Sequence, residues 1–244
     1  MFHTLTVKLR NRPAGEILRL LVLNVAQAMR KLSLADRRAR RQEKAFDRRW
    51  GTDTIRGVSV RELGFTSEQM DRCHRYDASS DAMVHGPIAM LDIDPARFHF
   101  IDYGAGKGRA LMLALQIGFA HVTGVELSAQ LCAIAEANLA IFAACNPSYP
   151  TVDVVSADAT AYRPEGEHLL AYFYNPFGPE IMTAVRQRLE AAHHDDGSDI
   201  YVLYANPEFG HVFAADGWRE LPAPMGVSAF RYMPAARSGS GKEW

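Results

Sequence analysis

The chain has 244 residues, of which 48% are hydrophobic, and a net charge of −1 at neutral pH. This length and composition suffice to bury a full α/β core. No apolar run reaches the roughly 18 to 20 residues that span a bilayer, and no segment has the pattern of a signal peptide, so we expect a cytoplasmic protein rather than an integral membrane protein. Three cysteines without metal-ligand spacing predict neither a disulfide framework nor a zinc site.

Charge is distributed unevenly along the chain. Residues 1–50 contain 13 Lys and Arg against 4 Asp and Glu, whereas the rest of the chain is acidic overall. A basic arm beside an acidic domain can bind nucleic acid, an anionic membrane surface or an acidic protein. It can equally be a solvated helix face that docks on the acidic domain of its own chain, and the sequence leaves both interpretations open.

The first 94 residues read as an extension made of helices and loops. Apolar residues recur at every third or fourth position from Ala14 to Met29, which predicts an amphipathic helix. The strongly charged stretch from Leu34 to Trp50 predicts an exposed helix that ends near Gly51. We therefore expect a basic helical extension and a lid segment over residues 1–94, a second domain over residues 95–235 and a disordered tail over residues 236–244.

From Phe98 onward, apolar strands alternate with helices. The expected strands and helices are Phe98–Tyr103, Lys107–Ile117, His121–Glu126, Ser128–Ala144, Val152–Ala157, Leu169–Asn175, Pro179–Ala192 and Ile200–Ala205, followed by a short helix within 207–217 and a hairpin of 218–221 with 227–233. This order predicts an α/β fold, a Rossmann-like doubly wound seven-stranded sheet with five parallel strands, a terminal antiparallel hairpin and an N-terminal helical extension.

The loop after the first of these strands reads "FIDYGAGKGRALMLAL", with glycines at 104, 106 and 108. Glycine lets a backbone approach a ligand closely at the carboxyl ends of parallel strands. A dinucleotide-binding loop has the pattern G-x-G-x-x-G, which would place its third glycine at position 109, where this chain has Arg109. The spacing therefore disfavours NAD. Asp102, just before the loop, would repel a pyrophosphate and attract a cationic ligand.

"FIDYGAGKG" resembles motif I of the class I methyltransferases that depend on S-adenosylmethionine (SAM), and the resemblance extends over about residues 98–233. It is similar to a bacterial group of this family whose substrate is unassigned. The resemblance implies SAM as cofactor and places Asp102 near the methionine amino group. It implies that the loop residues line the methionine and ribose, which makes Tyr103, Gly104, Gly106, Lys107 and Gly108 candidate cofactor-binding residues.

Two further acidic residues fall where this resemblance requires them. Glu126 ends the second strand, where a carboxylate can accept both ribose hydroxyls, and Leu127 follows it. Asp158 matches the position at which the family holds the adenine amino group, with Ala159 offering a backbone amide. Each acid alone is also compatible with an ordinary cap or surface residue, so the indication comes from all three acids in register with the glycines.

The fourth strand ends in "YFYNPFG", which resembles the N-P-P-Y or N-P-P-F motif of amino methyltransferases. The resemblance implies that Asn175 and the Pro176 carbonyl accept hydrogen bonds from a target amine, that Phe177 stacks on it, and that Asn175 also lies beside the cofactor. This chain has one proline where that motif has two, and an Asn-Pro step is also a common strand-to-helix turn. Upstream of the glycine loop, Tyr76 and Ser79 are candidate lid or substrate contacts, with a surface helix start as the alternative.

The function that follows as an expectation is SAM-dependent N-methylation of a protein or a small molecule. An RNA methyltransferase, to which the basic arm would supply phosphate contacts, is one alternative. A non-catalytic SAM-binding or scaffold protein is another, in which the N-terminal helices bind a partner or a membrane face. His74 and His85 flank the lid and are the best candidates for a base, and no cluster predicts a metal. The sequence does not determine the oligomeric state.

Overall fold

The structure is a computed structural model, and it describes residues 34–55 and 78–234. The amphipathic helix expected over Ala14–Met29, the candidates Tyr76 and His74, and the tail expected over residues 236–244 lie outside these described residues. The chain divides into two compact units, Met1–Ala45 and Phe46–Trp244, and the sheet belongs to the second. No helix in the described ranges is both long enough and apolar enough to cross a bilayer.

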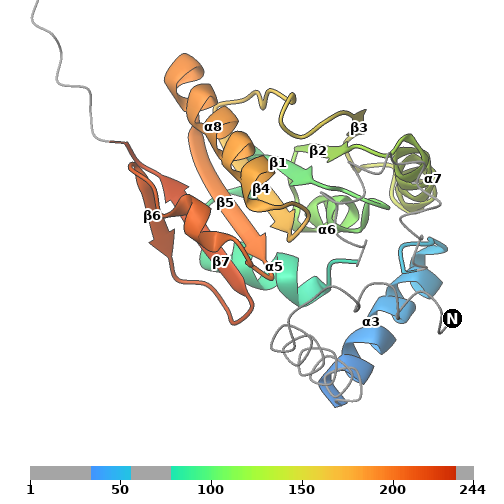
Figure 1. Cartoon of the computed structure of the whole chain (residues 1–244). Helices are drawn as coiled ribbons and strands as arrows, with labels where there is room; N and C mark the ends of the chain where they lie inside the picture. Colours follow the sequence, from blue (N-terminus) through green and yellow to red (C-terminus); the bar gives the residue numbers. More distant parts are fainter. Residues whose placement is uncertain (1–33, 56–77, 235–244) are drawn as a thin grey trace, which may run out of the picture. The chain divides into compact units, whose positions relative to one another are not determined.

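The centre of the second unit is a seven-stranded sheet of order β3-β2-β1-β4-β5-β7-β6 (Figure 1). Strands β1 to β5 are parallel, and β7 adds antiparallel to β5 and pairs with β6. The strands are β1 (His99–Tyr103), β2 (His121–Glu126), β3 (Val152–Ser156), β4 (His168–Tyr174), β5 (Asp199–Ala205), β6 (Trp218–Leu221) and β7 (Val227–Tyr232). The predicted doubly wound sheet and its terminal hairpin are therefore confirmed.

Helices pack against both faces of the sheet, and they form two separate apolar cores. One core contains buried residues of α5 (Asp81–Met90), α6 (Arg109–Ile117) and α7 (Ala129–Cys145). The other contains Met182, Val185 and Leu189 of α8 (Pro179–Asp196). Figure 1 shows α8 and α6 on opposite faces. Both central strands, β4 and β5, are buried along nearly their whole length, as expected for parallel strands covered on both sides.

The element boundaries differ from the sequence predictions by a few residues, for identifiable reasons. The helix expected from Lys107 begins at Arg109, because Gly108 adopts φ 82° and precedes it as the N-cap. Ser128 is likewise an N-cap, since its hydroxyl accepts from the Leu131 amide, and does not belong to α7 itself. The short helix expected within 207–217 is a single 3₁₀ turn, η2 (Gly210–Phe213). A second 3₁₀ turn, η1 (Pro95–Arg97), leads into β1.

Helix α3 (Leu34–Trp50) has the predicted bounds, but the exposure expected for it does not extend to its last turn. Phe46 and Trp50 are partly buried, with ring centroids 6.2 Å and 4.7 Å from that of Phe142 on α7. Buried residues of α5 also belong to the core that contains residues of α6 and α7. Segments upstream of residue 95 thus contribute to the core of the sheet unit, and a domain boundary at 95 remains a prediction.

Candidate functional site

The glycine loop lies at the carboxyl end of β1, between the strand and α6. Gly104, Gly106 and Gly108 have φ of 84°, 54° and 82°, a region that residues with a side chain rarely adopt. A Cβ added to Gly104 would lie 2.7 Å from the Cβ of Pro176. The motif at the end of β4 therefore packs directly against the glycine loop, and the loop requires glycine both for its backbone and for this contact.

Glu126, the last residue of β2, fixes the shape of this loop. Its Oε2 accepts from the Gly106 amide at 2.9 Å and its Oε1 accepts from the Ser128 amide at 2.9 Å. Burial raises the pKa of Glu126, while the backbone amides that it accepts from lower it in part. A carboxylate has about four lone-pair sites, so both oxygens can accept further hydrogen bonds from a ligand.

Asp102 is the second buried carboxyl group at this end of the sheet, and it is only 4% exposed. Burial, followed by the negative charge of Glu126, raises the pKa of Asp102 to about 8. Within the described residues, no hydrogen bond counteracts this effect. A buried carboxyl group without a compensating donor is stabilised by a cation that binds beside it. This end of the sheet is therefore suited to a ligand that brings a positive charge.

The third acid is more exposed than the first two. Asp158 lies after β3, and its Oδ1 accepts from both the Thr160 amide at 2.8 Å and the Thr160 hydroxyl at 2.7 Å. Both contacts use the same carboxylate oxygen. Ala159, the next residue, is buried. Asp158 thus has a local structural role in a turn, and its role toward adenine remains a prediction.

Two loop residues direct their side chains away from the glycines. Tyr103 is fully buried and stacks on Phe173 in the core on the α8 side, and burial raises the pKa of its hydroxyl, which has no hydrogen-bond partner among the described residues. The Lys107 ammonium group, 1% exposed, donates to Asp53 Oδ2 at 3.1 Å. Tyr103 and Lys107 can therefore offer a ligand only their backbone, because the Tyr103 ring lies in the core and the Lys107 side chain pairs with Asp53.

Residues 47–55, which we call the clasp, hold the start of α6. Asp47 accepts from the Thr52 hydroxyl and from the amide and hydroxyl of Thr54. Buried Arg109 donates to Thr54 Oγ1 at 2.7 Å and to Asp47 Oδ1 at 3.3 Å, and its guanidinium lies 3.8 Å from the centre of the Phe46 ring. The arginine at position 109, where a dinucleotide site would have a third glycine, thus joins the clasp to the loop.

Asn138 of α7 completes this connection. Its Oδ1 accepts from the Asp53 amide at 2.9 Å, and its Nδ2 donates to the carbonyls of Asp53 at 3.2 Å and Lys107 at 3.1 Å. The clasp was not predicted from the sequence, which showed only a charged helix before Gly51. The sequence did offer one signal, which is the pair of basic residues Lys107 and Arg109 at the start of a helix that is too apolar to pair with them.

Asn175 follows β4 directly and has φ 41°. Its Oδ1 accepts from the Tyr204 hydroxyl at 2.8 Å, and its Nδ2 donates to Glu208 Oε2 at 3.2 Å. Phe177 is partly buried against the core on the α8 side. The structure thus brings Asn175 and Pro176 to the edge that carries the glycine loop, and adds Tyr204 and Glu208, which sequence reasoning had missed.

The lid candidate Ser79 is buried, and its Oγ accepts from the hydroxyl of Tyr172, the register partner of Asp102 on β4. It therefore lies on the same side of the sheet as Asp102. The candidate base His85 lies on α5, and its Nε2 is buried without a hydrogen-bond partner among the described residues. In the described part of the chain, no group of three or more His, Cys, Asp or Glu is arranged to hold a metal ion.

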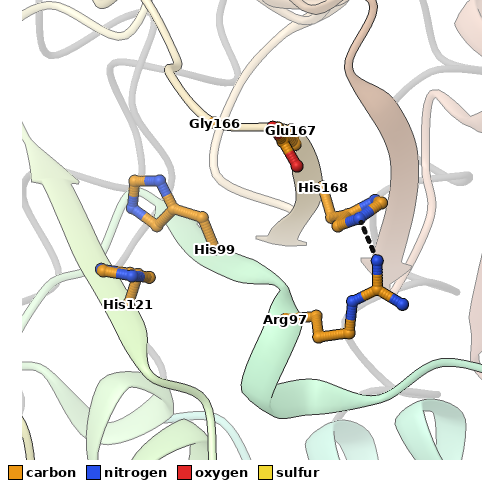
Figure 2. Close-up of a pocket in the computed structure, with 6 residues that line it drawn as sticks. All are labelled: Arg97, His99, His121, Gly166, Glu167 and His168. Carbon is orange, nitrogen blue, oxygen red and sulfur yellow. Dashed lines mark hydrogen bonds between the residues drawn. The ribbon is translucent and has the colours of Figure 1, made fainter.

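A hollow of about 350 Å³ lies at the amino ends of the parallel strands, opposite the end that carries the glycine loop (Figure 2). It is lined by Arg97, His99, His121, Gly166, Glu167 and His168. The ring nitrogens of His99 lie 2.9 Å from the Glu165 carbonyl and 2.7 Å from the Thr123 hydroxyl, and Arg97 lies 3.2 Å from His168. His99, His168 and Arg97 therefore already have partners within the chain, and we assign no ligand to this hollow.

No family model and no curated protein matches the sequence. Solved structures with a similar fold include the ribosomal protein L11 methylase of Lactobacillus delbrueckii subsp. bulgaricus, which is 14% identical, covers 61% of this chain and 75% of that chain, and has a TM-score of 0.43. Magnesium protoporphyrin IX methyltransferase of Synechocystis PCC 6803, solved with bound SAM, is 12% identical, covers 56% and 70%, and has a TM-score of 0.41. TrmN of Thermus thermophilus is 17% identical, covers 64% and 49%, and has a TM-score of 0.46.

Proposed function

We propose that this protein is a SAM-dependent methyltransferase that methylates a nitrogen of a protein or small-molecule acceptor. The observation that carries the proposal is the pair of buried carboxyl groups, Asp102 and Glu126, around a loop whose glycines all have positive φ. The ammonium group of an amino acid beside Asp102 would offset the unfavourable free energy of a buried negative charge, and a ribose diol has two hydroxyls to donate to Glu126. A pyrophosphate would place like charges together at the same point.

The cofactor would be held mainly by residues at the ends of β1, β2 and β3. Asp102 would bind its ammonium group, Glu126 its ribose hydroxyls, and Asp158 with Ala159 its adenine. The backbone from Tyr103 to Gly108 would lie along it, and the Leu127 backbone would lie next to the ribose. When bound, SAM supplies a methyl group on a positively charged sulfur, which is a good leaving group.

The acceptor would bind at the end of β4. Asn175 and the Pro176 carbonyl supply hydrogen-bond acceptors there, and the contact of Pro176 with Gly104 keeps this turn against the cofactor loop. Fixed acceptors of this kind orient a nitrogen lone pair, so their contribution to the rate is mainly positional. Ser79, and Tyr76 as an unplaced candidate, would contact the cofactor or the acceptor from the lid.

Calorimetry of SAM binding in two buffers with different heats of ionisation tests the cofactor assignment. We expect binding near pH 7 to release protons, because a cation beside Asp102 favours its ionised form and lowers a pKa of about 8. Transfer of radiolabelled methyl groups from SAM into a lysate, followed by protease, nuclease and size separation, then identifies the acceptor. Label released by nuclease would favour an RNA acceptor, and binding without transfer would favour a binding protein. Absence of SAM binding would contradict the proposal.

A further inference from the structure

Two neighbouring strands end in the same dipeptide. β4 continues into Asn175-Pro176 and β5 into Asn206-Pro207, and the residues just before them, Tyr174 and Ala205, are register partners. Asn175 and Asn206 have φ of 41° and 50°, and they are the two non-glycine residues with positive φ in the described part of the chain. Such conformations are unfavourable and tend to gather at functional sites. The chain therefore turns sharply at two adjacent points of one edge.

The turn after β5 places the carboxylate of Glu208 next to the turn after β4. Glu208 follows Pro207, and its Oε2 accepts from Asn175 Nδ2 at 3.2 Å. The Tyr204 hydroxyl donates to Asn175 Oδ1 at 2.8 Å. The same hydroxyl accepts from the Phe209 amide at 3.4 Å. Because both ends of the Asn175 carboxamide have partners, its orientation is fixed, and Glu208 is the negatively charged group beside it.

Glu208 is exposed and keeps lone pairs beyond the one that Asn175 uses. A carboxylate in this position attracts a primary ammonium group, whereas a neutral hydroxyl gains no comparable Coulomb attraction. The Asn175 oxygen, which also has a second lone pair, can accept another hydrogen from the same nitrogen. The Glu208 carboxylate and the Asn175 oxygen together offer acceptors to a group that carries several N–H donors.

We propose that Glu208 selects the acceptor of this enzyme, and that the acceptor is a primary amine that binds in its ammonium form. This inference rests on the proposed methyltransferase function for its role in the reaction, but amine binding can be measured separately. An ammonium nitrogen has no lone pair and must lose one proton before it can attack. That proton can pass to bulk water, to which this exposed site is open.

The test is binding of n-butylammonium and of n-butanol to the full-length chain, followed through the side-chain amide resonance of Asn175 in isotope-labelled protein. We expect the wild type to bind n-butylammonium more tightly than n-butanol. Glu208→Gln should weaken n-butylammonium binding by about threefold to fivefold, the range of an exposed charge pair, and leave n-butanol binding unchanged. Glu220→Gln, which removes an exposed carboxylate from β6, is the matched control and should bind both probes as the wild type does.

Equal affinity of wild type and Glu208→Gln for n-butylammonium would overturn the inference, and so would equal affinity of the wild type for the two probes. Both titrations are made without SAM, which separates this result from the proposed function. A protein that shows the Glu208-dependent preference but binds no SAM would retain the amine site and lose the methyltransferase assignment. A protein that binds SAM but shows no such preference would lose only the amine site.

Discussion

The carboxyl ends of the parallel strands form two groups, which we call the first half (β1 and β2) and the second half (β4 and β5), and the two halves are built in different ways. At the ends of β1 and β2, Asp102 and Glu126 are 4% and 8% exposed, and backbone amides fix Glu126 in place. At the ends of β4 and β5, Asn175 is partly buried and Glu208 exposed, and side chains hold one another. The structure of the first half is thus determined by backbone hydrogen bonds and burial, whereas that of the second half is determined by hydrogen bonds between side chains at the turns.

This difference indicates what each half can recognise. A buried carboxyl pair discriminates strongly by charge, because an uncompensated charge is unfavourable in a medium of low polarity. An exposed carboxylate is screened by water and salt, and it gives a weaker preference. We therefore expect substitutions in the first half to affect stability and cofactor binding, and substitutions in the second half to affect mainly the acceptor.

One large effect is expected at the contact between the two halves. Gly104→Ala would place a Cβ 2.7 Å from that of Pro176 at a φ of 84°. Left-handed backbone costs about 1 kcal/mol and the overlap about 1 to 3 kcal/mol more, so the free energy of unfolding should fall by about 3 kcal/mol. Gly118→Ala, with φ 103° and nothing within 4 Å of its Cβ, is the control and should lose about 1 kcal/mol. Equal losses in denaturant unfolding would show that the Pro176 contact is unimportant.

A second effect is a pH dependence that arises in the first half. The pKa of Asp102 is raised to about 8 in the folded chain, so the folded state binds a proton more tightly than the unfolded state does. Stability should therefore be full near pH 4 and decrease as the pH rises toward 8, by up to about 1.4 kcal/mol per pH unit. Asp102→Asn should flatten this slope in thermal unfolding measured from pH 5 to pH 8. A variant with the slope of the wild type would show that another group titrates.

A smaller effect is expected where the clasp contacts the first half. Asn138→Ala removes hydrogen bonds to Asp53 and Lys107 and leaves buried backbone groups unpaired, which should cost about 2 kcal/mol. Amide exchange of Asp53 should become faster in the same variant. Asn146→Ala, at the exposed end of the same helix, should change stability by less than about 1 kcal/mol. If Asp53 exchanges as slowly in Asn138→Ala as in the wild type, the clasp does not depend on this side chain.

The sequence predicts the sheet well because its signals are local. Alternating apolar strands and helices determine the doubly wound order, and the glycines at 104, 106 and 108 mark the loop that the structure shows at the end of β1. The sequence also placed Glu126 at the end of the second strand, and because parallel strands end on one side of the sheet, the structure has it in contact with this loop. In these regions the periodicity of the chain and its tertiary environment point to the same structure.

The clasp and the Glu208 contact were not predicted because each joins residues far apart in the chain. Nothing in the charged stretch around Asp47 indicates that Arg109 is its partner, and 62 residues separate the two. Glu208 lies 33 residues after Asn175. The repeated Asn-Pro step in "YNPFG" and "ANPEFG" was a readable signal, because equal turns after adjacent strands bring their following residues together.

The smallest expected effect concerns the second half and tests whether its side chains hold one another. Tyr204→Phe removes the hydroxyl that donates to Asn175 Oδ1 at 2.8 Å and leaves the ring in the core. The loss of one hydrogen bond should lower the free energy of unfolding by about 1 kcal/mol. If Tyr204 positions Asn175, the side-chain amide resonance of Asn175 should shift while SAM affinity stays that of the wild type, because the first half is untouched. Tyr201→Phe, on the same strand with its ring on the other face, is the control and should leave that resonance in place. An Asn175 resonance that does not move in Tyr204→Phe would mean that Glu208 alone orients the carboxamide.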